Sequence, residues 1–331
     1  MEVVAGVHQI KVPFPKGTRG ETNAYIVKGD AGDILVDTGW DSPEGLSAFI
    51  KGVEWDRLKL KDIRQIVITH VHPDHYGLAG KLKELCGAKV AMHRIEAQLI
   101  DSRYADSEEL ATKVKAELAG YGVPRAELAE FVDASPGMRG FAPPEPPEIL
   151  LEEGNTISNG SFRFKVIETP GHSPGHISLY EPAKRLFFCG DFVLYNVVPY
   201  VGLHPQSGDN PLGDYLNSLE NVKELSVSFI FPGHGAVFNS LRLRVEEIIQ
   251  LREQRNRDIL KALGGDLKTV YQVAEKVPWK PETGGVPFHD LGAWERRLAV
   301  RETAAHIRLL TLQDKVAKTD KEGVSLFLAK D

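Results

Sequence analysis

The segment Thr69–His75 constrains this chain more than any other stretch, because it reads Thr-His-Val-His-Pro-Asp-His. Three histidines and one aspartate lie within six positions, directly after a short β-rich run and before a helical pattern. A turn between a strand and a helix places these four side chains on one loop. Imidazoles and carboxylates are ligands of zinc and other borderline transition metals. The segment therefore predicts a metal site at the end of a strand.

Four ligands on one loop do not close a catalytic site, so we expect further donors at other strand ends. Three candidates follow predicted strands and adjoin glycines: His172 in Thr-Pro-Gly-His, Asp191 after Cys189-Gly190, and His234 in Pro-Gly-His-Gly. Glycine lets the backbone approach a site closely. We interpret Cys189 as a packed neighbour of Asp191, because metal-assisted hydrolysis needs no protein nucleophile.

Short apolar runs alternate with helical patterns in the first part of the chain, which indicates α/β layering. Ser42 is expected to cap a helix that has Pro43 at its first position, and residues 76–86 also have helical spacing. Strands are predicted on both sides of a helical segment at 93–132, which favours two sheets over one. The predicted strands are 23–28, 33–37, 63–69, 89–92, 149–151, 162–167, 177–179, 186–189 and 227–231.

Residues of about 93–147 form a helical insertion in this pattern, which ends in the prolines at 143, 144, 146 and 147. The insertion either packs as ordinary helices or roofs the site. A boundary is expected near 240, which divides the chain into a catalytic domain at 1–240 and a second domain at 241–331. Three helical patterns followed by two β-rich runs give the second domain a winged-helix order.

Composition limits the class of protein. The chain has 331 residues, 42% of them hydrophobic and 26% charged, which is typical of a folded globular protein. No apolar run is long enough to span a membrane, and two cysteines do not form a secreted disulfide framework, so we expect a cytoplasmic protein. The net charge of −6 argues against a nucleic-acid coat. It divides into +3 for residues 241–331, with 17 basic and 14 acidic residues, and −9 for the remainder.

Five pieces of the sequence resemble, in order, the motifs of the metallo-β-lactamase superfamily. They are Asp37 in Val-Asp-Thr-Gly, the 70–75 run, His172, Asp191 and His234. The resemblance implies an α/β fold, an αββα sandwich with the site at one edge of its two sheets. It also implies two divalent metal ions, zinc by expectation, with iron or manganese as alternatives.

The same resemblance implies a role for each residue. His70, His72 and His172 would hold one metal, Asp74, His75 and His234 would hold the second, and Asp191 would bridge both. Asp37 would accept a hydrogen bond from a ligand histidine, and His176 would support the loop that carries His172. Asp74 and Asp191 would therefore be catalytic as well as metal-binding.

Departures from the superfamily pattern narrow the activity. Its true β-lactamases have no bridging aspartate at the position of Asp191, so antibiotic hydrolysis is not expected. Residues 169–176 and 190–192 resemble the glyoxalase II group of thioester hydrolases. The tail instead resembles the winged-helix extension of a branch that includes endoribonucleases acting on single-stranded RNA, through residues 214–219 and 271–276.

Two hypotheses follow for the reaction. In the first, a hydroxide bridging two metals roughly 3.5–4 Å apart attacks the carbonyl of a small ester, thioester or lactone, and Tyr195 donates a hydrogen bond to a substrate oxygen. The rival is a metal-dependent endoribonuclease whose +3 tail contacts RNA, although dimerisation as a homodimer or a lid explains the tail equally well. A non-catalytic metal scaffold would be favoured only by a missing ligand, and none is missing.

Overall fold

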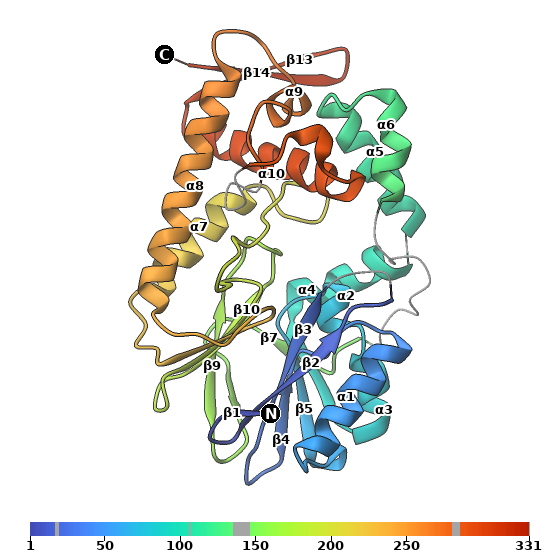
Figure 1. Cartoon of the computed structure of the whole chain (residues 1–331), viewed down its shortest axis with the longest axis vertical. Coiled ribbons are helices and arrows are strands. Elements are labelled where there is room, and N and C mark those ends of the chain that lie inside the picture. Colours follow the sequence, from blue (N-terminus) through green and yellow to red (C-terminus); the bar gives the residue numbers. More distant parts are fainter. Residues whose placement is uncertain (17–19, 106, 135–145, 280–284, 331) are drawn as a thin grey trace.

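Two β-sheets pack face to face and carry helices on their outer faces (Figure 1). The computed structural model describes residues 1–16, 20–105, 107–134, 146–279 and 285–330. The four-layer arrangement confirms the predicted αββα sandwich. Part of the predicted proline cluster, at 143 and 144, lies outside the described residues.

The first sheet has the strand order β1-β2-β3-β4-β5-β6-β7. Strands β4, β5, β6 and β7 are parallel neighbours, so their carboxyl ends share one edge. The apolar residues 34–36 of β4 and 66–68 of β5 are all buried, which fits strands that are covered on both faces. The bounds are β1 Glu2–Val4, β2 Val7–Pro13, β3 Glu21–Val27, β4 Asp33–Val36, β5 Ile63–Ile68, β6 Lys89–His93 and β7 Ile149–Leu151.

The second sheet has the order β12-β11-β10-β9-β8, and β11 and β12 are parallel. Tyr25, Phe188 and Phe231 belong to the buried apolar layer between the two sheets, and the Phe188 and Phe231 rings stack with centroids 4.3 Å apart. The bounds are β8 Thr156–Ser158, β9 Arg163–Glu168, β10 Ile177–Glu181, β11 Leu186–Gly190 and β12 Phe229–Pro232.

Helices close both outer faces. Helices α1 Pro43–Trp55 and α3 Ala79–Cys86 contribute to a core on the first sheet, and α7 Pro211–Val222 and α8 Leu241–Leu263 contribute to a core on the second. Ser42 caps α1 as predicted, with its side chain accepting from the Gly45 amide. The helix predicted at 76–86 begins later, as α3 at Ala79. Tyr76 belongs instead to the short helix α2 Pro73–Tyr76. None of the helices in the described ranges is long and apolar enough to cross a bilayer.

The insertion contains α4 Arg94–Ile100, the π-helical turn η2 Asp101–Ala105, α5 Ser107–Gly120 and α6 Arg125–Asp133. The tail contains α8, α9 Val270–Ala274, α10 Ala293–Leu312 and the hairpin of β13 Val316–Lys321 and β14 Val324–Ala329. Three helices and a hairpin follow in the predicted order, while the winged-helix assignment and the boundary near 240 stay predictions.

Insertion and tail share one apolar core, although they lie far apart in sequence (Figure 1). Leu118 of α5 and Phe131 of α6 are fully buried in the same cluster as Ile259 of α8 and Val300 of α10. The Arg296 guanidinium of α10 adds ion pairs to Glu127 and Glu130 of α6. Helices α5 and α6 are therefore built into the tail, whereas Ile100 of α4 and Tyr104 of η2 belong to the core on the first sheet.

Candidate metal centre

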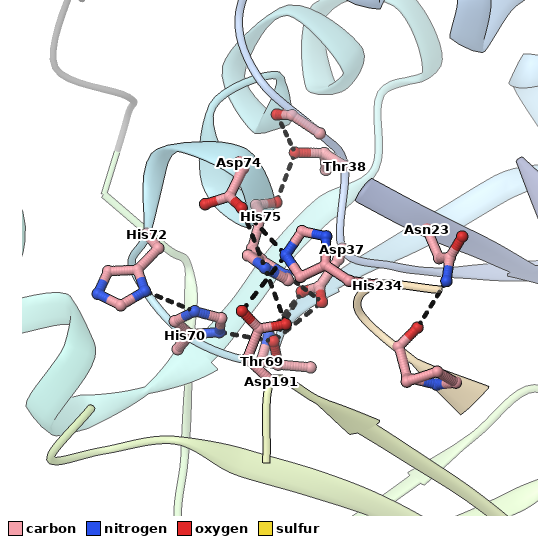
Figure 2. A network of polar contacts seen from close by, with 12 residues as sticks. Asn23, Asp37, Thr38, Thr69, His70, His72, Asp74, His75, Asp191 and His234 are labelled. Atoms are coloured by element: carbon pink, nitrogen blue, oxygen red, sulfur yellow. Dashed lines mark hydrogen bonds and ion pairs between the residues drawn. The ribbon is translucent and has the colours of Figure 1, made fainter. Parts of the chain in front are cut away.

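The loop after β5 carries the predicted histidine cluster. Thr69 follows the strand, His72 is the N-cap residue of α2, and Pro73 takes the first helical position, where its missing N–H is not needed. The short helix turns Asp74 and His75 inward beside His70. Figure 2 shows these side chains converging with Asp191 and His234, which come from the second sheet.

The first group of converging ligand atoms comes from three histidines. His70 Nε2 lies 2.8 Å from His72 Nδ1, and His172 Nε2 lies 2.9 Å from the same atom. His172 lies in the loop between β9 and β10, so this group joins the two sheets. The three nitrogens form a set that could hold one metal ion, named here the first triad.

The second group comes from Asp74, His75 and His234. Asp74 Oδ2 lies 3.6 Å from His75 Nε2 and 3.2 Å from His234 Nε2. His234 follows β12, and its ring meets Phe14 edge to face. These three atoms form the second triad, which could hold another ion.

Asp191 lies between the two triads. Its Oδ1 is 3.4 Å from His75 Nε2, while its Oδ2 is 3.3 Å from His234 Nε2 and 3.7 Å from His172 Nε2. One carboxylate therefore reaches ligands of both triads. Asp191, His70 and His75 also form a further set compatible with a metal.

Two glycines make this convergence possible. Gly190 has φ +45°, and a Cβ there would lie 2.6 Å from Thr69 Oγ1. A Cβ on Gly233 would lie 2.5 Å from Asp191 Oδ1 and 2.6 Å from His75 Cε1. Any larger residue at either position would push a strand end away from the ligands.

Asp37 organises the loop from the end of the neighbouring strand β4. Its carboxylate accepts from the Thr69 amide at 2.8 Å and from Thr69 Oγ1 at 2.9 Å, and its Oδ2 lies 2.8 Å from His75 Nδ1. This contact places the His75 proton on Nδ1 and leaves Nε2 to face the second triad.

Three other histidines of the two triads are oriented in the same manner. Thr69 Oγ1 lies 3.0 Å from His70 Nδ1, and backbone carbonyls of Tyr200 and Glu21 each lie 2.8 Å from Nδ1 of His172 and His234. Each contact fixes the proton on Nδ1 and directs the Nε2 lone pair into the cluster.

Burial and charge give the two triads different protonation. Burial and the neighbouring His75 hold the pKa of His70 well below its ordinary value, and burial with Arg103 does the same for the pKa of His72. Burial alone would lower the pKa of His75, but Asp191, Asp74 and Asp37 raise it to about 10. Without metal, the first triad is therefore neutral, and the second holds protons that a cation would replace.

Two buried atoms indicate that the residues present fit a cation. His75 Nε2 and Asp191 Oδ1 are buried and have no hydrogen-bond partner among the described residues. Buried polar atoms are usually satisfied, so an orphan pair inside a histidine–aspartate cluster fits metal ligation. Neutral imidazoles and carboxylates also suit divalent metals in charge and donor type.

His176 and Tyr195, the remaining residues singled out in the sequence, lie in different surroundings. His176 is fully buried, with Nδ1 2.8 Å from Thr169 Oγ1 and Nε2 accepting from the Asp191 amide at 3.3 Å. It therefore connects the His172 loop to the Asp191 loop. Tyr195 is 55% exposed, and its ring packs against Phe238. Its hydrogen bond to a substrate stays a prediction.

Sequence reasoning missed two supports of the centre. The fully buried Glu96 of α4 accepts from the Val71 amide and the Gly175 amide, both at 2.7 Å, and so ties together the loops of His72 and His172. Asn23 Nδ2 donates to the carbonyls of Pro232 and Gly235, which fixes the His234 turn. For Glu96, the available sequence signal was a single glutamate between the apolar residues Ile95 and Ala97.

Comparison with known proteins gives consistent matches. The profile of the Metallo-beta-lactamase superfamily matches residues 17–234. A probable metallo-hydrolase of Bacillus subtilis, YqjP, is 28% identical over 311 residues, covering 93% of this chain and 92% of its own. The human acyl-coenzyme A thioesterase MBLAC2 is 29% identical over 246 residues, covering 70% of this chain and 78% of its own.

Solved structures agree over the whole chain. A metallo-beta-lactamase family protein from Thermus thermophilus superposes with a TM-score of 0.81 at 26% identity, covering 99% of this chain and all of the other. A beta-lactamase domain protein from Burkholderia ambifaria gives a TM-score of 0.76 at 22% identity, covering 100% of this chain and 94% of its own, and this supports the fold alone. With its sandwich fold, its ligand-bearing strand ends and a profile match over more than half its length, the chain belongs to the metallo-β-lactamase superfamily and is a metal-dependent hydrolase.

Proposed function

We propose that this chain hydrolyses small thioesters, esters or lactones at a centre of two divalent metal ions, with zinc as the expected metal. The observation that carries the proposal is the position of Asp191, whose two oxygens lie within 3.7 Å of ligand nitrogens from both triads. A single carboxylate shared in this way is suited to a binuclear centre.

The residues would divide the work as follows. The first triad, His70, His72 and His172, would hold one ion. The second triad, Asp74, His75 and His234, would hold the other ion, and Asp191 would bind both ions. Two ions held so would lower the pKa of a water molecule and stabilise negative charge on a carbonyl oxygen. The protein keeps the ligand imidazoles in the binding tautomer through Asp37, Thr69 and backbone carbonyls. In a thioester, the water oxygen adds to the carbonyl carbon and the C–S bond breaks, which yields a carboxylate and a thiol.

The relatives support the thioester class. The human and bovine matches are named acyl-coenzyme A thioesterases, and a shorter match from Aspergillus fumigatus is named an atrochrysone carboxyl ACP thioesterase. All three names describe cleavage of an acyl–sulfur bond. We transfer this bond class to the present chain as a proposal, without transferring the acyl group.

Charge pairing in the tail weighs against the nuclease alternative. Several of the basic residues that give the tail its positive charge are engaged by carboxylates: Arg242 by Glu246, Arg244 by Glu247, Arg252 by Glu302, Arg296 by Glu127 and Arg301 by Glu117. RNA binding depends on cations that are available to neutralise phosphates. A paired tail is better suited to packing on the insertion.

The test is a substrate panel with purified protein of measured metal content. Acyl-CoA and acyl-N-acetylcysteamine thioesters, aryl esters, lactones and single-stranded RNA are offered to the wild type and to Asp191→Asn. We expect hydrolysis of thioesters or esters that disappears in Asp191→Asn. Asp33→Asn is the matched control, because Asp33 is a buried aspartate at the opposite end of β4 from Asp37 and should leave turnover unchanged.

Cleavage of RNA without cleavage of any ester or thioester, lost in Asp191→Asn and kept in Asp33→Asn, would overturn the proposal in favour of the nuclease. Ester hydrolysis that survives in Asp191→Asn at full rate with two bound metals would overturn the shared-carboxylate argument.

A further inference from the structure

Arg103 lies beside the first triad without a partner among the described residues. It belongs to η2, where the next residue, Tyr104, donates through its hydroxyl to the Val71 carbonyl at 2.7 Å. Val71 stands between His70 and His72, so this bond fixes η2 against the metal loop. Arg103 directly precedes Tyr104 and is buried, so it lies where η2 packs against the loop that carries His70 and His72.

The Arg103 side chain is only 8% exposed and forms no hydrogen bond or ion pair with any residue that the structure describes. The other buried arginines donate to a carbonyl or a carboxylate: Arg244 to Leu194, Arg252 to Glu302, Arg297 to Phe131 and Arg301 to Glu117. The nearby Glu96 does not serve Arg103, because its two oxygens accept the amides of Val71 and Gly175. Burying an unpaired cation is costly, so the fold gains nothing from Arg103 by itself.

More positive charge surrounds the same side of the first triad. Arg301 of α10 is 7% exposed, and its Nε has no partner among the described residues. The Tyr200 hydroxyl, also unpartnered in the described part of the chain, lies next to Arg301: a Cβ on Gly202 would be 1.9 Å from that hydroxyl and 3.2 Å from Arg301 Cβ. The Tyr200 carbonyl faces His172 Nδ1. Burial and then Arg301 and Arg103 lower the pKa of His204, which keeps that ring neutral.

We propose that Arg103 binds an anionic group of the substrate, a carboxylate or a phosphate, while the scissile carbonyl lies at the metal centre. A guanidinium matches the planar oxygens of such a group and forms charge-assisted hydrogen bonds with it. The inference rests on the proposed hydrolase function and deepens it. Because η2 packs against the loop that carries His70 and His72, a short linker would separate the anion from the carbonyl. The anion belongs either to the acyl half or to the thiol half of the substrate.

The experiment compares three thioesters with the metal-loaded full chain. Glutaryl-N-acetylcysteamine carries a carboxylate on the acyl half, the butyryl thioester of 3-mercaptopropionate carries it on the thiol half, and butyryl-N-acetylcysteamine is neutral. We expect one of the anionic substrates to be preferred at least tenfold in kcat/KM, and the preferred one identifies the half that carries the charge. Arg103→Gln should raise KM for that substrate about tenfold with little change in kcat, leave the neutral substrate unchanged, and be partly rescued by Arg103→Lys.

A second readout separates recognition from a structural role. Glutarate should raise the melting temperature of the wild type but not of Arg103→Gln. The melting temperature of Arg103→Gln without ligand should equal or exceed that of the wild type, because an unpaired buried cation is removed. Arg244→Gln is the matched control: Arg244 is equally buried but donates to two carbonyls, so its loss should lower the melting temperature and keep the substrate preference.

Failure of this proposal is distinguishable from failure of the hydrolase proposal. If thioesters are hydrolysed but Arg103→Gln keeps the anionic preference and glutarate binding, recognition by Arg103 is refuted and the hydrolase stands. If no thioester is hydrolysed, the glutarate measurement still decides: stabilisation that depends on Arg103 supports the anion site, and stabilisation independent of it refutes the site.

Discussion

Replacement of Asp37 by asparagine tests whether a residue that contacts a candidate ligand, but does not itself bind metal, controls metal affinity. Asp37 binds no metal in the proposed centre, yet its Oδ2 contacts His75 Nδ1 at 2.8 Å. In Asp37→Asn, the side-chain carbonyl can still accept from the Thr69 amide, but an NH₂ group then faces His75. Two donors cannot share that contact, so the His75 proton moves to Nε2, the atom that faces Asp74 and Asp191.

The size of the effect follows from this change of tautomer. Loss of a partner that orients a ligand histidine typically weakens metal binding 10–100-fold. Here the partner is lost and the wrong tautomer is favoured, so we expect about 100-fold, or about 2.8 kcal/mol, at the second triad. The first triad should change by less than about tenfold, because His70 keeps its contact with Thr69 Oγ1.

Calorimetric titration of metal-free protein with Zn²⁺, together with metal analysis after dialysis, measures the two sites. Asp33→Asn is the control, since it removes a buried carboxylate from the far end of the same strand. Equal affinities in Asp37→Asn and wild type, or a loss confined to the first triad, would refute the reasoning.

Three further predictions concern the bridge, the protons and the packing. Asp191→Asn should reduce the metal content from two ions toward one and lower kcat by at least about 10²-fold, measured by metal analysis and turnover; full occupancy with normal turnover contradicts it. Carboxylates raise the pKa of His75 to about 10, while burial keeps the pKa of His70 low. Zn²⁺ binding at the second triad should therefore release protons near pH 7 and strengthen as the pH rises toward 10, whereas binding at the first triad should be nearly independent of pH. Titration in buffers of different ionisation enthalpy counts the released protons, and equal release at both sites would contradict this prediction. Phe131→Ala should lower the free energy of unfolding by about 3–5 kcal/mol, because this fully buried ring joins α6 to the tail; urea unfolding measures it, and a loss below about 1 kcal/mol would show that insertion and tail do not share a core.

Much of the fold was predictable because its strands are short, apolar and bounded by turn residues. The α/β layering, the presence of two sheets and the cap at Ser42 follow from such local signals, whereas the αββα class was implied by the resemblance to the metallo-β-lactamase superfamily. Strand β2 is harder to predict, because alternation of Val7, Ile10 and Val12 with polar residues is a weaker signal than a continuous apolar run, although β2 pairs with β3 along its full length. Local patterns are weakest where a strand is half exposed.

The candidate ligands could be picked out from the sequence for a different reason: histidine and aspartate clustered at strand ends are uncommon and local. Their supports were not, because they act over long sequence separations. Glu96 ties two loops whose contacts lie at Val71 and Gly175, and Asn23 reaches the carbonyl of Pro232. No pattern in a short stretch of sequence indicates such contacts. A short stretch also does not indicate that Arg103 has no partner among the described residues.

The core shared by α5, α6 and the tail also determines the order in which the chain can fold during synthesis. Leu118 and Phe131 leave the ribosome well before Ile259 and Val300 exist to cover them. Strand β12 and His234, the last candidate metal ligand, are also made before α10. The two sheets and their histidines can therefore assemble while the apolar sides of α5 and α6 are still uncovered, which is when a nascent chain is most prone to aggregate. The proposed anion site at Arg103 is completed last, when α10 docks on α5 and α6.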